Sequence, residues 1–372
     1  MLKVGITGQN GFIGSYLFNS LGLFKEEFDR ILFDKSFFEE SEKLEEFVKK
    51  CDVIVHLAAL NRHENYNVLH DTNILLVEKL INALTKTKSK PHIIFSSSTQ
   101  EEKDNLYGKS KINCRELLIN WSLSSGGKFT GLIIPNVFGP FGKPNYNSVV
   151  ATFCYKLNNN ENPIINIDTT LKLIYVGDLT NIIIDKIRKS EINHQHIIND
   201  FYEVTVSNIL KKLFYFKESY LDNGVVPKLE SLFDINLFNT FRSYIGIENL
   251  FPRKYIKHSD YRGCFVEVIK LGVGGQISFS TTEQGVTRGN HFHTRKIERF
   301  SVIKGEALIQ LRKINDEKIY NFYLNGNEPS YVDMPIWFTH NIKNIGTDVL
   351  YTIFWINEFY NANDPDTYFE NV

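Results

Sequence analysis

The sequence feature that most limits the fold is a glycine-rich turn that follows directly on the first apolar run of the chain. The run covers residues 2–7, and the turn, with glycines at positions 8, 11 and 14, opens an amphipathic stretch at residues 12–21. Glycine permits a tight turn and lets backbone amides approach a pyrophosphate, whose charge is favoured at a helix N-terminus. This order of strand, glycine turn and helix predicts a site for a dinucleotide cofactor.

Apolar runs and amphipathic stretches continue to alternate along the first 220 residues. Buried strands are predicted at residues 2–7, 31–34, 53–57, 92–96 and 130–134. Apolar residues spaced by three and four predict helices at residues 12–21, 42–50, 69–84, 107–123, 149–156, 179–189 and 206–216. The pattern predicts an α/β fold with a Rossmann-like, doubly wound parallel sheet and helices on both faces.

The C-terminal third has a different pattern of apolar residues. Short alternating runs, separated by Gly, Asn and Asp, predict antiparallel strands at residues 265–269, 276–280, 307–312, 319–324 and 349–356. A chain of 372 residues also exceeds the usual size of one hydrophobic core. We therefore predict an α/β domain with a substrate-side lobe at residues 1–245 and an all-β barrel at residues 246–372. The connection between them is expected within residues 221–251.

Composition excludes several classes of partner. The 42 basic and 43 acidic residues give a net charge of −1, so no global field would hold nucleic acid. The first residues lead straight into the predicted strand without the features of a signal peptide. No apolar run approaches the roughly 20 residues of a membrane span, so we expect no membrane insertion and a cytoplasmic protein.

A tyrosine and a lysine four residues apart form the second chemical signal. Tyr107 and Lys111 would share one face of the helix predicted at residues 107–123. An ammonium group beside a phenol favours the phenolate, which lowers the tyrosine pKa toward neutrality and allows proton exchange with a carbonyl. Ser98 follows the fourth predicted strand, where its hydroxyl could bond the same carbonyl oxygen.

Residues 1–245 resemble the extended short-chain dehydrogenase/reductase family of sugar-nucleotide enzymes. Besides the glycine turn and Ser98, Tyr107 and Lys111, three segments carry the resemblance. They are His56-Leu57-Ala58-Ala59, Pro135-Asn136-Val137-Phe138-Gly139-Pro140 and Tyr175-Val176-Gly177-Asp178. The family implies that Tyr107 protonates the developing alkoxide, that Ser98 holds its oxygen, and that Lys111 contacts the nicotinamide ribose while lowering the tyrosine pKa.

The predicted cofactor site joins the glycine turn to residues that follow later strands. It comprises Gly8, Asn10, Gly11, Phe12, Ile13, Gly14, Asp34, Lys35, Leu57, Ala58, Ala59, Tyr107 and Lys111. Asp34 could accept hydrogen bonds from the ribose 2′-hydroxyl of NADH, whereas Lys35 could pair with the 2′-phosphate of NADPH. The residues themselves leave both cofactors open.

Four residues of the C-terminal domain have the types and spacing of a metal site. His291 and His293 alternate along a predicted strand and so point to one face, where Glu298 and His340 could complete a shell of three nitrogens and one oxygen. The full spacing, from Gly285 to Asn344, resembles both motifs of the cupin family. Zinc is the first choice, with nickel, iron and manganese left open.

Two segments narrow the resemblance to cupins that epimerise keto-sugars. Residues 260–263 and Val286-Thr287-Arg288-Gly289-Asn290-His291 look like segments of dTDP-keto-sugar 3,5-epimerases. Those enzymes imply that His291 removes a proton next to a ketone. A histidine bound to metal cannot accept a proton at the same nitrogen. The sequence therefore leaves two alternatives open: the metal is catalytic and polarises the sugar ketone, or it is structural and another group is the base.

Three further segments accompany this fusion of a reductase with an epimerase-like cupin. They are Lys143-Pro144-Asn145-Tyr146-Asn147-Ser148, Gly289-Asn290-His291 and Asp364-Pro365-Asp366-Thr367-Tyr368-Phe369. With them, the chain resembles a family of bifunctional capsular-polysaccharide enzymes over essentially its whole length. The resemblance implies epimerisation at carbon 3 of UDP-2-acetamido-2,6-dideoxy-β-L-arabino-hexos-4-ulose, followed by reduction at carbon 4 to UDP-2-acetamido-2,6-dideoxy-L-talose, toward UDP-N-acetyl-L-fucosamine. It also implies NADPH, a homodimer and substrate contacts at Asn136, Asn145 and Arg288.

Two other functions remain open at this stage. One is a redox-neutral, NAD-dependent sugar-nucleotide 4-epimerase or dehydratase, which Asp34 slightly favours. The other is a sensor that binds a nucleotide sugar without turnover, which the intact set of Ser98, Tyr107 and Lys111 disfavours.

Overall fold

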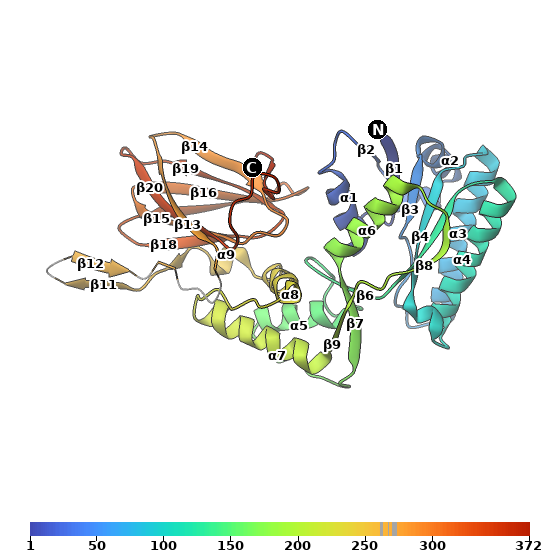
Figure 1. The fold of residues 1–372 in the computed structure, drawn as a ribbon, viewed down its shortest axis with the longest axis horizontal. Coiled ribbons are helices and arrows are strands. Elements are labelled where there is room, and N and C mark those ends of the chain that lie inside the picture. The colour runs from blue at the N-terminus through green and yellow to red at the C-terminus, as the bar shows by residue number, and fades with distance from the viewer. Residues whose placement is uncertain (261–262, 267, 270–273) are drawn as a thin grey trace. The chain divides into compact units, whose positions relative to one another are not determined.

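The computed structural model describes residues 1–260, 263–266, 268–269 and 274–372 (Figure 1). By internal contacts the chain forms two compact units, Met1–Thr152 with Ile165–Ser207 and Phe153–Ile164 with Asn208–Val372. This division reflects packing alone, so the domain boundary at residue 245 stays a prediction. Tyr261 and Arg262 of the segment 260–263, and Glu267 of the strand expected at 265–269, lie outside the described residues.

The first unit is built on a six-stranded parallel sheet with the order β2-β1-β3-β4-β5-β8. Its strands are β1 (Leu2–Thr7), β2 (Phe28–Ile31), β3 (Val53–His56), β4 (His92–Ser98), β5 (Phe129–Ile134) and β8 (Asn193–Ile197). Every residue of β3 and β5 is buried, as expected for central strands covered on both faces. The predictions of β1, β3, β4 and β5 are confirmed.

Helices cover both faces of this sheet (Figure 1). On one face, Leu80 and Leu118 from two helices pack with Ile54 of β3, whereas on the other Leu17 and Ile183 pack with Val55. Because successive strand residues point to opposite faces, this confirms the doubly wound fold. The helices are α1 (Phe12–Leu21), α2 (Ser41–Lys50), α3 (Tyr66–Thr87), α4 (Leu106–Ser125), α5 (Val149–Asn158), α6 (Val176–Lys189) and α7 (Val206–Phe216).

Two strands of the first unit depart from the prediction. The strand predicted at residues 31–34 begins where β2 ends, because Asp34 already caps a short 3₁₀ turn, η1 (Lys35–Phe38), by accepting a hydrogen bond from the Ser36 amide at 2.8 Å. The edge strand β8 was not predicted, because its sequence NHQHI is largely polar. A smaller sheet has the order β6-β7-β9, from β6 (Asn136–Phe138), β7 (Thr170–Tyr175) and β9 (Tyr202–Thr205).

The second unit contains antiparallel sheets, which confirms the all-β, cupin-like prediction. Two five-stranded sheets have the orders β10-β18-β15-β20-β13 and β17-β16-β19-β14-β21, and β11 pairs with β12. The strands are β10 (Arg253–Lys254), β11 (Lys257–Asp260), β12 (Gly263–Val266), β13 (Gln276–Thr282), β14 (Thr287–Phe292), β15 (Glu298–Lys304), β16 (Glu306–Lys313), β17 (Ile319–Asn325), β18 (Ser330–Met334), β19 (Phe338–Asn344), β20 (Leu350–Ile356) and β21 (Tyr368–Phe369).

The stretch expected to be a connection contains a buried helix, α8 (Leu232–Arg242), followed by the short α9 (Ile247–Leu250). Arg242 donates to the Met334 carbonyl at 2.9 Å, next to a fully buried ion pair in which Arg299 contacts Asp333 at 2.7 Å. These contacts fasten α8 to the strands of its own unit. No helix in the described part of the chain is both long and apolar enough to cross a membrane.

Candidate functional site

A cleft of about 1370 Å³ lies at the carboxyl ends of β1, β3, β4 and β5 in the first unit. This is the edge where ligands bind in open α/β sheets. Predicted residues that line the cleft are Gly8, Asn10, Gly11, Phe12, Ile13, Gly14, Leu57, Ala58, Ala59, Ser98, Tyr107, Lys111 and Asn136. The structure therefore brings most of the predicted cofactor and catalytic residues of the first unit to one cavity.

The glycine turn has the tight geometry that its sequence predicts. Gly8 has a φ of +76°, which favours glycine, and a Cβ on Gly14 would lie 2.2 Å from the Gly8 carbonyl oxygen. α1 begins at Phe12 immediately after this turn, so its free amides face the cleft. The turn can thus hold a pyrophosphate by the mechanism expected of it.

Ser98, Tyr107 and Lys111 reach the cleft from β4 and α4. The Ser98 hydroxyl caps the turn η2 (Thr99–Glu102), accepting from the Gln100 amide at 3.2 Å. Lys111 is 3% exposed, and its Nζ donates to the Ser96 carbonyl oxygen at 2.9 Å. The Tyr107 hydroxyl donates to Oδ1 of Asn61 at 3.2 Å.

The pKa of Tyr107 departs from the sequence-based expectation. Burial, with a smaller contribution from Tyr146, raises the pKa of Tyr107 to about 12, in the direction opposite to the predicted one. Lys111 directs its ammonium to the Ser96 carbonyl, and its Nζ lies 5.6 Å from the centre of the Tyr107 ring. Burial also lowers the pKa of Lys111 itself to about 8.

Four other predicted or quoted residues of the first unit lie outside the cleft lining. Asp34 and Lys35 are exposed, although the neighbouring Phe33 amide bonds to Gln9 of the glycine turn at 3.2 Å. Asn145 is exposed, and its amide donates to Thr152 Oγ1 at 3.0 Å. His56 is buried, its Nδ1 lies 2.8 Å from Thr7 Oγ1, and burial lowers its pKa to about 3, as for a packed strand-end histidine.

A pair of loops, whose contact the sequence did not predict, meets across the cleft. Asn147 donates from Nδ2 to the Asn61 carbonyl at 3.1 Å, and Arg62 donates to the Tyr146 carbonyl at 2.7 Å. All four residues line the cleft. Residues 143–148 were recognised as part of the family resemblance, but without a role for Tyr146 or Asn147. Asn61 and Arg62, just after the His56 segment, belong to no motif recognised in the sequence.

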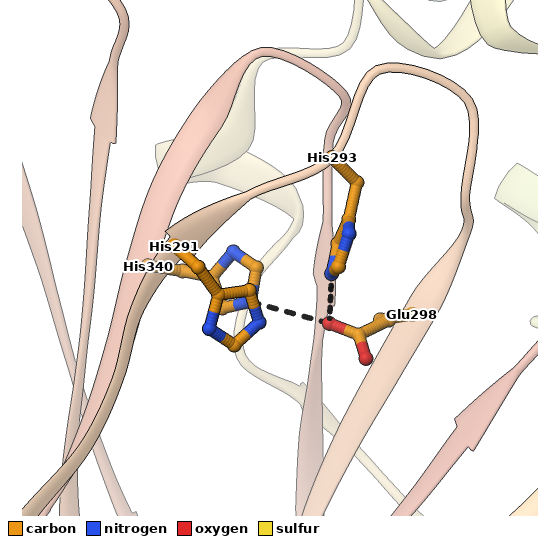
Figure 2. Close-up of side chains that lie close together, drawn as sticks. All are labelled: His291, His293, Glu298 and His340. Atoms are coloured by element: carbon orange, nitrogen blue, oxygen red, sulfur yellow. Dashed lines mark hydrogen bonds and ion pairs between the residues drawn. The ribbon is translucent and has the colours of Figure 1, made fainter. Parts of the chain in front are cut away.

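The second unit brings together the four predicted metal ligands. Figure 2 shows His291, His293, Glu298 and His340 converging from β14, β15, β19 and the loop after β14, and their ligand atoms all lie within 4.8 Å of one another. Oε2 of Glu298 lies 2.9 Å from Nε2 of His293 and 3.2 Å from Nε2 of His340. Burial, together with the two other histidines, lowers the pKa of His291 to about 4, which leaves a neutral imidazole able to bind a cation.

Backbone carbonyls orient two of these rings toward the centre of the cluster. Nδ1 of His293 bonds to the Asp366 carbonyl, and Nδ1 of His340 lies 3.2 Å from the Phe338 carbonyl. Both rings therefore present Nε2 inward, toward Oε2 of Glu298 (Figure 2). Three nitrogens and one carboxylate oxygen, with the His293 and His340 rings held by backbone carbonyls, fit a divalent transition metal.

The Asp366 side chain closes the loop between β14 and β15, which carries His293. Its carboxylate accepts hydrogen bonds from Thr294 through the amide at 3.0 Å and the hydroxyl at 2.6 Å, and from the amides of Arg295 and Lys296, each at 3.0 Å.

Arg288, predicted to contact substrate, lies on β14 beyond a bulge, where it is exposed and donates to the Thr281 carbonyl at 3.4 Å.

Family models match two separate stretches of the chain. The family model described as "NAD dependent epimerase/dehydratase family" matches residues 4–199, more than half of the chain. The chain belongs to this family. A second model, "Polysaccharide biosynthesis C-terminal domain", matches residues 258–368, so this member of the family carries an additional domain.

Three relatives are informative. A "UDP-2-acetamido-2,6-beta-L-arabino-hexul-4-ose reductase" of Pseudomonas aeruginosa is 33% identical over 377 aligned residues, covering 99% of this chain and 98% of the relative. The crystal structure of the capsular polysaccharide assembling protein CapF from Staphylococcus aureus matches all of both chains at 36% identity, with a TM-score of 0.63. The spore coat polysaccharide biosynthesis protein SpsL of Bacillus subtilis is 25% identical over 130 residues, covering 32% of this chain and 86% of that protein.

Proposed function

We propose that the chain is a CapF-type enzyme that reduces the 4-ketone of a UDP-linked 2-acetamido-2,6-dideoxy sugar in the synthesis of a polysaccharide precursor. The observation that carries this proposal is the full-length similarity to a reductase of that sugar class, in a chain whose cleft joins a dinucleotide turn to Ser98, Tyr107 and Lys111. The first unit is the reductase, and the C-terminal domain epimerises carbon 3 beforehand.

The cofactor fits the cleft because the glycine turn offers free amides to its pyrophosphate. When bound, NADPH would supply the hydride that reaches carbon 4. Tyr107 protonates the carbonyl oxygen as the alkoxide develops, and Ser98 holds that oxygen by a hydrogen bond. Lys111 contacts the ribose. Lys35 supports NADPH by pairing with its 2′-phosphate, Asp34 would suit NADH, and Asn136 is a proposed substrate contact from the other wall of the cleft.

The metal cluster supports the epimerase role. His291, His293, Glu298 and His340 would hold zinc, which would polarise the sugar ketone and so acidify the proton at carbon 3. Since that acidity depends on the ketone at carbon 4, epimerisation must precede reduction. Arg288 is a proposed contact for the same substrate. Elemental analysis of the purified protein tests the identity of the metal, and one zinc per chain is expected.

Two further properties belong to the same proposal. We expect a homodimer, which light scattering across a range of protein concentrations would test. We also expect the enzyme to act in the cytoplasm, where reduced nicotinamide cofactors and nucleotide sugars are available. Fractionation of the source cells followed by immunodetection would test this location.

The deciding experiment follows cofactor absorbance when the purified protein meets the UDP-4-keto-6-deoxy-N-acetylhexosamine. We expect NADPH consumption that requires the keto-sugar and falls by about 1,000-fold or more in Tyr107→Phe, because the proton donor is lost. Tyr323→Phe, which changes an exposed tyrosine of the second unit, is the control and should match the wild type. Sugar conversion without net consumption of NADPH or NADH would instead establish a redox-neutral epimerase or dehydratase, and binding without conversion would establish a sensor.

A further inference from the structure

The group that contacts the reactive oxygen of Tyr107 is a neutral carboxamide. Tyr107 Oη lies 3.2 Å from Oδ1 of Asn61, whereas Lys111 directs its ammonium to the Ser96 carbonyl. Both Asn61 and Tyr107 line the cleft. A hydrogen-bond partner on the phenol oxygen influences proton transfer directly, because this oxygen must release its proton to the substrate.

The backbone that carries Asn61 is anchored at three consecutive residues. Leu60 exchanges two hydrogen bonds with the buried Asn73 side chain, at 2.7 and 3.1 Å. The Asn61 carbonyl accepts from Asn147, and Arg62 donates to the facing loop. Asn73 is 2% exposed and also donates to Ser110 of α4 at 3.2 Å. The helix that carries Tyr107 and the loop that carries Asn61 therefore share one buried brace.

We propose that Asn61 is a catalytic residue of the reductase, which binds the Tyr107 oxygen in both of its protonation states. The proposal rests on the proposed reductase function. A carboxamide has an acceptor oxygen and a donor NH₂ group, and rotation about its last torsion exchanges them. In the substrate-free protein Asn61 accepts from the neutral phenol. With the ketone bound, the phenol turns its single proton to the ketone oxygen, and the rotated carboxamide donates an N–H to the phenolate that remains.

The step balances without any change of charge on Asn61. The hydride brings an electron pair to carbon 4, the electrons of the carbonyl π bond move to oxygen, and this oxygen takes the proton of Tyr107. The remaining negative charge lies on Tyr107 Oη, next to the carboxamide. A donor at this position matters because burial raises the pKa of Tyr107 and so disfavours its phenolate.

Two substitutions separate the roles of the carboxamide. Asn61→Asp keeps the shape and the acceptor but removes the donor and adds a negative charge, so the phenolate loses its partner and meets a repelling carboxylate. We expect kcat for keto-sugar reduction to fall about 100-fold in Asn61→Asp and about tenfold in Asn61→Ala, with the KM for NADPH changed less than about twofold. The control is Asn67→Asp, which adds the same charge at an exposed position of α3 and should match the wild type.

A second readout requires no substrate. Ultraviolet or NMR titration of tyrosine, taken as the difference from Tyr107→Phe in each background, reports the pKa of Tyr107. A carboxylate at position 61 disfavours the phenolate, so this pKa should be higher in Asn61→Asp than in the wild type, and Asn67→Asp should leave it unchanged. Thermal unfolding verifies that each variant folds. If one does not, Asn61→Gln is measured in its place, because the longer side chain moves the carboxamide away from its position beside Tyr107.

The outcomes separate the two proposals. If wild-type protein consumes no cofactor with the keto-sugar, the reductase function fails, while the titration still decides whether Asn61 acts on Tyr107. If the wild type turns over but Asn61→Asp retains kcat within twofold and an unchanged Tyr107 pKa, the catalytic role of Asn61 is overturned. Loss of NADPH affinity together with kcat would also overturn it, because that result indicates a structural role.

Discussion

At the scale of single residues, the burial of Lys111 sets the pH range over which this side chain is charged. Its ammonium is desolvated on α4, and this lowers its pKa to about 8. The lysine is protonated below that pH and becomes neutral as the pH rises through it. Its charge is therefore present at neutral pH and lost in mildly alkaline solution.

We predict that reductase turnover falls as the pH rises above about 8, approaching tenfold per pH unit once Lys111 has lost its proton. The measurement is kcat for keto-sugar reduction between pH 6 and 10 at saturating NADPH, with circular dichroism confirming that the protein stays folded. A rate that stays level to pH 9.5 would contradict a role for the Lys111 charge.

The sequence predicted the grouping of Ser98, Tyr107 and Lys111 at one cleft better than it predicted their contacts. Ser98, Tyr107 and Lys111 could be found because two of them share a helix and the third ends the adjoining strand. Asn61 could not be found, because its contact with Tyr107 joins residues 46 positions apart and depends on where a loop folds. The direction of the Tyr107 pKa shift was also missed, since burial and the hydrogen bond of Lys111 are properties of the packed structure.

At the scale of elements, the loop between β14 and β15 owes its form to a single carboxylate. The four hydrogen bonds accepted by the Asp366 side chain fix the turn directly after His293, while the Asp366 carbonyl orients the His293 ring. Groups that orient a ligand in this way usually contribute a factor of about 10 to 100 in metal affinity.

Asp366→Ala should weaken zinc binding about 10- to 100-fold, because the loop that carries His293 loses its brace. Competition with a chromophoric chelator measures the affinity, and the d–d spectrum of a Co²⁺-substituted protein reports the geometry. Asp364→Ala is the matched control, because Asp364 is more exposed and pairs with Arg295 alone among the residues of this loop. Equal affinities in the two variants would contradict this role of Asp366.

Elements were predicted where one periodicity dominates. α1 matches its predicted range because its apolar residues recur at helical spacing after a clear start signal. α8 was not predicted because nearly all of its residues are buried. Its sequence therefore lacks the exposed polar face that makes a helical periodicity visible. The polar β8 strand was missed for the opposite reason, since it lies at the edge of the sheet.

At the scale of the whole molecule, each compact unit has its own internal contacts, and the four predicted metal ligands lie in the second. Metal held at about 100 times its dissociation constant adds about 2.7 kcal/mol to the stability of the unit that binds it. For a unit of this size, that corresponds to a shift in melting temperature of about 5–10 °C.

Removal of the metal with a chelator should therefore lower the melting transition of the second unit by about 5–10 °C and leave that of the first unchanged. Scanning calorimetry with and without chelator tests this, and NADPH, which should raise only the first transition, identifies which is which. A chelator that shifts both transitions equally, or neither, would refute the assignment of the metal to the second unit alone.

The confinement of each site to its own unit also has a genetic meaning. The described residues that line the cleft all precede residue 149, whereas the metal ligands all follow residue 290. Two family models likewise match the two stretches separately. Mutations can therefore change the cleft without changing the histidine cluster, and the reverse. An allele with a damaged cleft would keep an intact histidine cluster, and an allele with a damaged cluster would keep an intact cleft.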